Sequence, residues 1–534
     1  MVASAAASSG REVGVVAGAG LSERRRMAIF FVMAVGQFMA LLDIQIVASS
    51  MNAIQAGLSA AADEIDWLQT AYLMAEIVMI PLSAYLAQAL STRWMFVASA
   101  GLFTVASLMC GLAWDLQSML LFRVVQGFVG GAMIPLVFAT GFSFFDGPRR
   151  AMVTSVLGVI STLSPALGPA VGGWITDTES WRWLFLINVV PGALVTAGLV
   201  WLGPFDRAQP SLLPRIDWVH AASLAVFLGG LQYVLEEGPR HQWFADATIA
   251  SVAWIAAVGA VVFFERCFFS HSPVVSLAPF RRKGFWAAGV LSFVTGVGLY
   301  TITYLTPVFL ARVRDFPSHS IGLTTFVAGV FMTASAPVAA WTATKIDMRI
   351  CMAIGLVLYA LSFWMISAVG SDWGFWQLFW IQAVRGAGVL FCMVPSVSMA
   401  LNNLPDAELK PASGLINLMR NLGGALGIAL VNTGLQRYFA WHVQQLAQSL
   451  GRAPQDAMAA VAGLAQRLAI DMPSPDQAPM AARAAIGQMV AREALTGAFQ
   501  DVFRLCAWVF IAALAAVPFC RGGSMMPDET QHHH

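Results

Sequence analysis

Four ionisable residues lie inside long apolar stretches of this sequence, where a charge has little water around it. They are Asp43, Glu76, Arg123 and Arg385. In hydrocarbon such a group is costly unless it faces a partner or water, so each marks a functional position by default. Burial and a nearby arginine act in opposite directions on the pKa of a carboxyl group, so a carboxylate under both influences can exchange a proton near neutral pH. The chemistry expected of these residues is proton exchange coupled to a cationic or polar substrate that competes for the same charge.

The depths of these residues suggest a specific ion pair. Asp43 and Arg123 each lie about five residues from the same end of their apolar stretches, which is roughly 7–8 Å at about 1.5 Å per residue. They can therefore pair if their helices are neighbours, whereas Glu76 lies deeper, at roughly 13–14 Å. A fixed structural bridge between Asp43 and Arg123 is the alternative to a role in coupling, and scaffolding is equally an alternative for Arg385 and Arg420.

The composition identifies lipid as the solvent of this chain. Of its 534 residues, 58% are hydrophobic and 11% are charged, against roughly 25% charged residues in soluble proteins. The three lysines (Lys283, Lys345 and Lys410) do not follow glycine, so no phosphate-binding loop of the Gly-Lys type is expected. The cysteines show no metal-ligand spacing, and the sequence has no hydrolase or metalloprotease motif. We therefore expect neither an enzyme nor a bound cofactor or metal.

Fourteen apolar stretches predict an all-α polytopic membrane protein, since a membrane helix needs about 20 mostly apolar residues. Arginine and lysine gather in the loops of one side, which predicts that both termini are cytoplasmic. The expected spans are 27–48, 67–90, 94–113, 118–140, 151–175, 183–202, 217–235, 247–264, 284–311, 321–343, 350–369, 373–400, 411–431 and 498–520.

A short internal repeat divides the spans into two halves. The fourth span contains Arg123-Val-Val-Gln126-Gly127, and the twelfth contains Gln382-Ala-Val-Arg385-Gly386, so arginine and glutamine are exchanged. Repeats of this kind place the substrate site near the midplane, between the halves. The resulting division is a disordered N-terminal tail at 1–26, a six-helix half at 27–203, two inserted helices with their loops at 204–283, a second six-helix half at 284–520 and a C-terminal tail at 521–534.

One polar segment, 432–497, is too long for an ordinary connection and is expected on the outer side. It contains Pro454, Pro473, Pro475 and Pro479, and its stretches 436–450 and 457–469 are helical and amphipathic in pattern. Loops of this length are usually functional or disordered. Docking to a partner outside the membrane and a floppy insertion are the two interpretations.

Glycine and proline are concentrated in the fourth and fifth spans. Small residues four apart let helices approach closely, and proline bends a helix, so a pivot for alternating access and simple tight packing are both consistent with the pattern. The residues concerned are Gly127, Gly131, Pro165, Gly168, Pro169, Gly172 and Gly173.

Polar, aromatic and methionine side chains on several spans are expected to line an adaptable substrate cavity. Contact with lipid or packing in the core is the alternative for each of them. The set is Gln37, Phe38, Gln126, Met133, Tyr300, Tyr304, Gln382, Arg385, Asn417 and Arg420.

Several of these segments resemble motifs of the major facilitator superfamily, and within it of the fourteen-span drug:proton antiporters of the EmrB/QacA family. The resemblance covers about Arg26 to Cys520. The segments are Leu42-Asp43-Ile44-Gln45-Ile46-Val47 in span one, Arg123-Val-Val-Gln126-Gly127 in span four, Ser164 to Gly173 in span five, and Trp181 to Asn188 before span six.

The resemblance implies the MFS fold and proton-driven export of lipophilic drugs or toxic compounds across a bacterial inner membrane. It also implies a tripartite pump with a periplasmic adaptor (an EmrA-like membrane-fusion protein) and an outer-membrane channel. Asp43 is carried over as the proton and substrate carboxylate, and Arg123 as its partner. Export of a single endogenous metabolite or fatty acid is the alternative, and a membrane enzyme or a scaffold is the remaining one.

One family motif is missing. The loop after span two in the family resembles Gly-x-Leu-x-Asp-Arg-x-Gly-Arg, whereas this chain has Ala84-Tyr-Leu-Ala-Gln88-Ala-Leu-Ser91-Thr-Arg93. Both glycines and the acid are absent. The charge latch that this loop provides, which favours one conformation, is therefore in doubt.

Overall fold

Long helices form the whole bundle, which a computed structural model describes for residues 20–61, 64–146, 148–270, 273–282, 284–402, 404–452, 454–471 and 477–520. Within these ranges there is no β-strand. The predicted tails at 1–26 and 521–534 therefore lie largely outside the described residues, as do Lys283, Pro473 and Pro475. Thirteen helices of the described part are long and apolar enough to cross a membrane. A fourteenth helix of 31 residues, α6, packs between α1 and α12, and the predicted all-α polytopic fold is confirmed.

The helices follow the predicted spans closely. The first half contains α1 (Glu23–Ser49), α2 (Met51–Leu58), α3 (Trp67–Leu90), α4 (Thr92–Gly111), α5 (Leu116–Phe144), α6 (Pro148–Thr178), α7 (Trp183–Leu186) and α8 (Val189–Trp201). The inserted region contains η1 (Pro210–Arg215), α9 (Trp218–Glu237), η2 (Trp243–Ala245), α10 (Ala247–Phe269) and η3 (Ala278–Arg281). The second half contains α11 (Phe285–Arg312), α12 (Ser318–Lys345), α13 (Met348–Ile366), α14 (Phe375–Leu401), α15 (Asp406–Arg452), α16 (Pro454–Asp471), α17 (Ala478–Ala513) and η5 (Leu514–Phe519).

Short polar side chains begin several of these helices. The Asp115 carboxylate accepts a hydrogen bond from the Ser118 amide (2.8 Å) at the start of α5, and Asp217 accepts one from the His220 amide (3.0 Å) at the start of α9. Such caps satisfy amide groups that have no partner within the helix. Because hydrocarbon offers no hydrogen bonds, a continuous helix between two caps is the conformation that satisfies the backbone of each span.

The internal repeat is visible in how the helices pack. A Cβ atom on Gly127 of α5 would collide with the Tyr72 carbonyl of α3, and one on Gly386 of α14 would collide with the Ala328 carbonyl of α12. The repeated glycine therefore lets the same two helices touch backbone to backbone in each half. On this alignment Glu76, four residues after Tyr72, corresponds to the residue four after Ala328, which is a methionine.

The glycines of α6 also pack closely, in this case against α1. A Cβ atom on Gly168 would collide with the Gln45 side chain, and one on Gly172 would lie 2.5 Å from the Ser49 hydroxyl. The helix runs without interruption from Pro148 to Thr178, and the carbonyl of Gly173 accepts a hydrogen bond from Thr176 (3.0 Å). The side chains of Pro165 and Pro169 lie outside the described part. Close packing is therefore observed, and the pivot stays a prediction.

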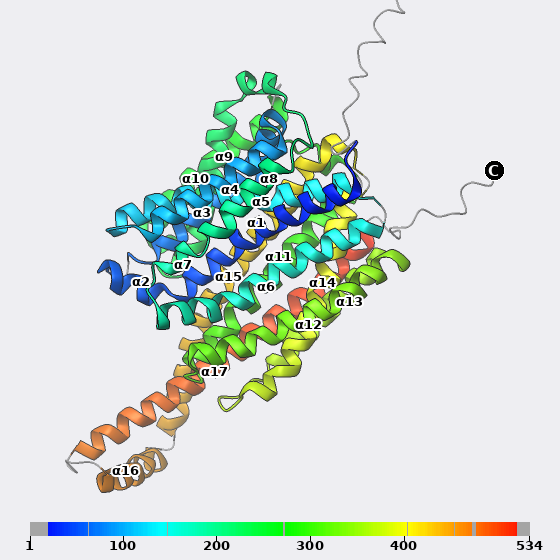
Figure 1. Ribbon diagram of the computed structural model, residues 1–534. Helices are drawn as coiled ribbons and strands as arrows, with labels where there is room; N and C mark the ends of the chain where they lie inside the picture. The colour runs from blue at the N-terminus through cyan, green and yellow to red at the C-terminus, as the bar shows by residue number, and fades with distance from the viewer. Residues whose placement is uncertain are drawn as a thin grey trace, which may run out of the picture.

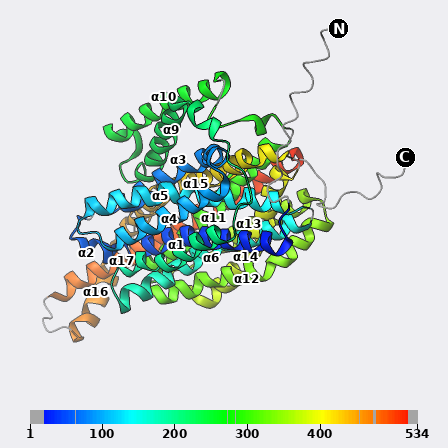
Figure 2. The same ribbon diagram turned by 45° about the horizontal axis from the view of Figure 1, so that its top comes forward.

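The inserted helices α9 and α10 lie at the edge of the bundle (Figure 2). They pack on each other, and α9 contacts α3 of the first half and α15 of the second. At one end of α9, Glu237 accepts a hydrogen bond from the Thr70 hydroxyl (3.0 Å), and Arg240 pairs with Asp66 at 2.6 Å. The insertion is thus attached to both halves.

The polar segment 432–497 is not a loop for most of its length. The residues that follow the predicted thirteenth span continue α15, a helix of 47 residues, and those before the fourteenth begin α17, a helix of 36 residues. Both expected amphipathic stretches are helical, as the alanine, leucine and glutamine in them favour. In Figure 1 this extension projects from one end of the bundle, with α16 at its tip. We call that end the far end, and the opposite end, where α1 begins and η5 ends, the near end.

Contacts between the two halves close the near end. The Ser413 hydroxyl of α15 donates to the Pro135 carbonyl of α5 (2.9 Å), and Arg150 of α6 donates to the Asn402 carbonyl after α14 (3.1 Å). Lys410 of α15 donates to the Ala87 carbonyl of α3 (3.4 Å).

A different acid replaces the one missing from the loop after α3. Asp206, which follows α8, accepts hydrogen bonds from the Ser91 hydroxyl (2.7 Å) and the Thr92 amide (2.5 Å) at the start of α4. The same carboxylate lies 3.6 Å from the Lys410 ammonium, and both side chains are largely buried. The chain therefore has a charge contact between its halves at the near end, although the family's motif for it is absent.

Removing this contact should open the near end. With Lys410→Met, α4 keeps its Asp206 cap but the halves lose their ion pair, so we expect the distance between spin labels at the exposed residues Trp94 (α4) and Ile350 (α13) to shift to longer values. Double electron–electron resonance measures this distance. Arg149→Gln is the matched control, because it removes the exposed Arg149–Glu23 pair within one half. An unchanged distribution in Lys410→Met, or an equal shift in the control, would show that this contact does not hold the halves together.

Candidate functional site

The predicted pair of Asp43 and Arg123 is present. Arg123 of α5 donates from Nη1 to Asp43 Oδ2 of α1 over 2.6 Å, and both side chains are 0% exposed. The spans α1 and α5 are neighbours, which was the condition for this pair to form. Because two opposite charges meet without water between them, their attraction is stronger than that of an exposed pair at the same distance.

The other carboxylate oxygen of Asp43 is also satisfied. Asp43 Oδ1 accepts hydrogen bonds from Asn188 Nδ2 (2.7 Å) and Gln126 Nε2 (3.1 Å). The Ser107 hydroxyl of α4 accepts hydrogen bonds from the same two amides, both at 3.0 Å. It donates one to the Phe185 carbonyl (3.0 Å). The ion pair is therefore the centre of a network that joins α1, α4, α5 and the α7–α8 connection.

The arginine is held from further sides. Its guanidinium lies 4.2 Å from the ring centre of Tyr72, Nη1 also donates to Gln126 Oε1 (2.8 Å), and Nε donates to the Leu68 carbonyl (3.4 Å). A cation over an aromatic face is stabilised most where water is excluded. These contacts link the network to α3, and they fit a structural pair as well as one that opens during a transport cycle.

Asn188 and Ser107 were not identified from the sequence. Asn188 ends the Trp181–Asn188 segment, which signalled the family without assigning a role to this residue. Ser107 lies in an apolar span, where a lone serine gives no signal. Gln126, expected to line the cavity, instead serves the ion pair.

Glu76 contrasts with Asp43. It lies on α3 one turn from Tyr72 and is 6% exposed. Within the described residues its carboxylate has no hydrogen-bond or ion-pair partner, although the charge of Arg123 acts on it. A Cβ atom on Gly131 would lie within 3.2 Å of the Glu76 Cα atom, so α5 fixes the backbone that carries this acid. Glu76 is therefore a buried acid whose charge is not matched by direct contact.

Further predicted residues meet where the two halves face each other. Tyr300 of α11 donates its hydroxyl to Asn421 Oδ1 of α15 (3.0 Å) and is within electrostatic range of both Glu76 and Arg420. Arg420 donates to Asn417 one turn away. Its guanidinium also lies 5.6 Å from the ring centre of Phe138 on α5. We call Glu76, Tyr300, Asn417, Arg420 and Asn421 the junction cluster.

The other expected cavity residues are dispersed. Gln37 is buried and donates to Ser161 of α6 (3.4 Å), while Met133 is fully buried in the core of α5. Phe38 is partly buried on α1, and Tyr304 donates its hydroxyl to Asn432 (2.8 Å). No group of three histidine, cysteine, aspartate or glutamate side chains placed to hold a metal occurs in the described part of the chain.

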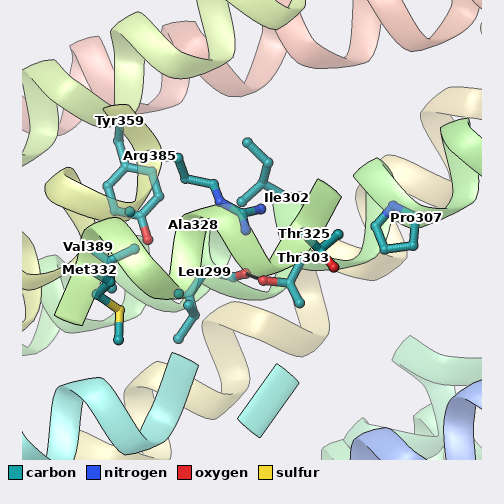
Figure 3. A pocket seen from close by; sticks show the side chains of 12 residues that line it. Leu299, Ile302, Thr303, Pro307, Thr325, Ala328, Met332, Tyr359, Arg385 and Val389 are labelled. Atoms are coloured by element: carbon teal, nitrogen blue, oxygen red, sulfur yellow. Dashed lines mark hydrogen bonds between the residues drawn. The ribbon is translucent and has the colours of Figure 1, made fainter. Parts of the chain in front are cut away.

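Arg385 and Gln382 lie in the second half, away from the Asp43 network. Arg385 lines a pocket between α11, α12, α13 and α14 together with Thr303, Thr325 and Tyr359 (Figure 3). It is 6% exposed, and among the described residues no carboxylate pairs with it. The exchange of arginine and glutamine in the repeat thus places a second buried cation in a half that lacks the acids of the first.

The sequence matches the Major Facilitator Superfamily over residues 33–428. It is 41% identical over 499 residues to the colistin resistance protein EmrB of Acinetobacter baumannii, covering 93% of this chain and 96% of that protein. It is 28% identical over 416 residues to the fatty acid resistance protein FarB of Neisseria gonorrhoeae, covering 77% of this chain and 81% of that protein. The human organic anion transporter MFSD10 has the same fold, with a TM-score of 0.57 at 13% identity, over 92% of this chain and 99% of that one. The chain therefore belongs to the major facilitator superfamily and, within it, to the EmrB-type resistance transporters.

Proposed function

We propose that this transporter is a proton-driven antiporter that exports lipophilic compounds across a bacterial inner membrane as part of a tripartite efflux pump. The observation that carries the proposal is the buried Glu76 carboxyl group of the junction cluster, for which the described residues provide no direct partner. The sequence favoured Asp43 as the principal proton carrier. Because the Asp43 carboxylate is paired on both oxygens, we assign that role to Glu76.

The argument rests on charge balance. Asp43 is matched by Arg123 and accepts two further hydrogen bonds, so neither of its oxygens needs a proton. An ionised Glu76 adds one unmatched negative charge to the same buried region, and removing a charge from water without a partner is costly. Binding a proton cancels that charge. Asp43 and Arg123 then hold α1 and α5 together, while Glu76 changes its state.

The position of Glu76 suggests how a proton and a substrate could compete. The residue lies on α3, which contacts α15 of the other half, and its charge reaches Tyr300. A substrate group bound at the junction cluster would alter the electrostatic environment of Glu76, and the protonation state of Glu76 would alter substrate affinity in return. This reciprocity is the thermodynamic basis of exchange. The energy source is the proton motive force, and we propose no cofactor.

The excess of arginine and lysine in the near-end loops favours a cytoplasmic near end and a periplasmic far end. On this orientation the contacts of Lys410, Ser413 and Arg150 join the two halves on the cytoplasmic side and must break to admit substrate. Alternating access then depends on exchanging these contacts for others at the far end.

The far-end extension is the proposed binding site for the periplasmic adaptor. It projects from the bundle (Figure 1) and carries Met458, Met480 and Met489, each more than 60% exposed. Flexible, exposed methionines suit the binding of an apolar partner surface. The relative in Acinetobacter is named for colistin resistance and that in Neisseria for fatty acid resistance, so lipophilic and amphiphilic molecules are the proposed substrates.

Glu76→Gln should abolish proton coupling and leave substrate exchange intact, because glutamine keeps the shape of the side chain but cannot titrate. The measurement is proton flux into reconstituted vesicles, after addition of the compound to which the wild type confers most resistance in a susceptibility panel. Counterflow of that compound, which needs no net proton movement, should persist. Glu265→Gln is the matched control, since Glu265 is half exposed on α10. Normal proton flux in Glu76→Gln would mean that another group carries the proton.

Asp43→Asn should lower stability by about 3–5 kcal/mol, because it leaves Arg123 buried without an anion. We expect a lower yield of monodisperse protein in size-exclusion chromatography and a lower melting temperature. The double variant Asp43→Asn/Arg123→Gln removes both charges and should recover most of the loss. If Asp43→Asn is as stable as the wild type, the pair is not what holds α1 and α5 together.

Replacing residues 446–479 by a short glycine–serine linker should abolish co-purification with an EmrA-type adaptor. The extension projects from the bundle (Figure 1), so we expect substrate binding by the shortened protein to equal that of the wild type, and this binding serves as the control for folding. Undiminished adaptor binding would place the docking surface elsewhere.

A further inference from the structure

Two arginines at the far end share one carbonyl oxygen. Arg314, in the connection between α11 and α12, donates from Nη1 to the Ser371 carbonyl over 2.8 Å, and Arg492 of α17 donates to the same oxygen from Nη2 over 2.8 Å. The two donor nitrogens are therefore at most twice this distance apart. Two guanidinium groups this close repel each other, and a single carbonyl dipole offsets only part of that repulsion.

No acid pairs with either arginine in the part of the chain that the structure describes. Asp315, Asp372 and Glu493 are their neighbours in sequence, but all three are exposed and none forms a salt bridge with them. The Nε atom of Arg314 is buried and has no hydrogen-bond partner among the same residues. Its guanidinium lies 5.4 Å from the ring centre of Phe316, a contact that does not cancel the charge. The site therefore carries two positive charges and lacks an anion.

This pair of arginines lies at the level of the lipid head groups. Ser371 belongs to the short connection between α13 and α14, and Arg314 lies two residues beyond the end of α11. Trp376 and Trp380, in the first two turns of α14, are 75% and 65% exposed. Exposed tryptophans at the end of a span mark the boundary between membrane and water. An anion held by the two arginines would therefore lie where the phosphates of the far-end leaflet lie.

We propose that Arg314 and Arg492 bind the phosphate of an anionic phospholipid in the membrane leaflet at the far end. A guanidinium has five N–H groups, and the Ser371 carbonyl accepts from only one group of each arginine, so further donors are available on both. The two free oxygens of a phosphodiester can each accept from one arginine, and charge-assisted hydrogen bonds of this kind are among the strongest in proteins. The bound lipid would join α17, at the base of the far-end extension, to the connections that follow α11 and α13.

Melting temperatures in nanodiscs of phosphatidylglycerol or phosphatidylcholine with the same acyl chains test this proposal, because the two lipids differ in net charge. A ligand that binds only the folded state stabilises it, so we expect phosphatidylglycerol to raise the melting temperature of the wild type. Arg314→Gln and Arg492→Gln should each show a smaller rise. In phosphatidylcholine both should melt close to the wild type, since the lost hydrogen bond and the relieved repulsion act in opposite directions. Arg312→Gln is the matched control, because it removes an exposed charge nearby that has no bond to Ser371.

Native mass spectrometry gives an independent count of bound lipid. Arginines at the near end also attract anionic lipid, so the difference between variants is the quantity measured. At one concentration of phosphatidylglycerol, the double variant Arg314→Gln/Arg492→Gln should retain one lipid fewer than the wild type and Arg312→Gln. Its affinity for that lipid should be about tenfold or more weaker, the range for loss of a charged hydrogen bond.

Four outcomes would overturn the proposal. The first is the same rise in melting temperature and the same lipid count in the wild type and the variants. The second is an equal fall of melting temperature in both lipids, because the arginines would then only support the Ser371 connection. The third is that inorganic phosphate, added to phosphatidylcholine nanodiscs at constant ionic strength, stabilises the wild type as much as phosphatidylglycerol does, since a free anion would then suffice. The fourth is normal lipid retention by the double variant with loss of an EmrA-type adaptor in co-purification, which would assign the arginines to a protein partner. None of these measurements requires transport, so the answer is independent of the proposed function.

Discussion

A buried ion pair determines how the first half of this protein is built. Arg123 and Asp43 have no exposed surface, so each needs the other, and the helices that carry them, α5 and α1, must be neighbours. The amides of Gln126 and Asn188 then satisfy the second carboxylate oxygen, which brings α4 and the α7–α8 connection to the same point. In hydrocarbon an unpaired charge would be costly, so the pairing of Asp43 with Arg123 and the two amides is a condition for the fold.

The two halves repeat this backbone without repeating its charges. Gly127 and Gly386 allow the same close helix contact, but the first half has two acids near Arg123, whereas no acid among the described residues pairs with the buried Arg385 or Arg420. The two halves therefore share a backbone arrangement and differ in the charged side chains that it carries. The buried acids Asp43 and Glu76 lie in the first half, and the buried arginines Arg385 and Arg420 lie in the second.

Much of this arrangement follows from the sequence. Apolar length predicts most of the membrane spans within a few residues, and similar depth indicated that Asp43 and Arg123 could pair if their helices were neighbours. The extension of α15 and α17 beyond the bundle was not predicted as a continuous structure, because an apolar window registers only the part of a helix that lies in lipid. Asn188 and Asp206 were missed for a different reason: each acts through a partner distant in sequence, and nothing in its own neighbourhood indicates which helix it will reach.

Asp206 provides a charged contact beside the loop that lacks the family's acid. It comes from the loop after α8, caps α4 and faces Lys410 of the second half. Lys410 also donates to the Ala87 carbonyl of α3, the helix that carries Glu76 of the junction cluster. Glu76 and Ala87, whose carbonyl accepts from Lys410, lie on one helix, α3, about 16 Å apart at about 1.5 Å per residue. Pro81 lies between these two residues and removes a backbone hydrogen bond of α3. On the proposed coupling, a change of charge at Glu76 would therefore reach the near end through a helix that can bend at this proline.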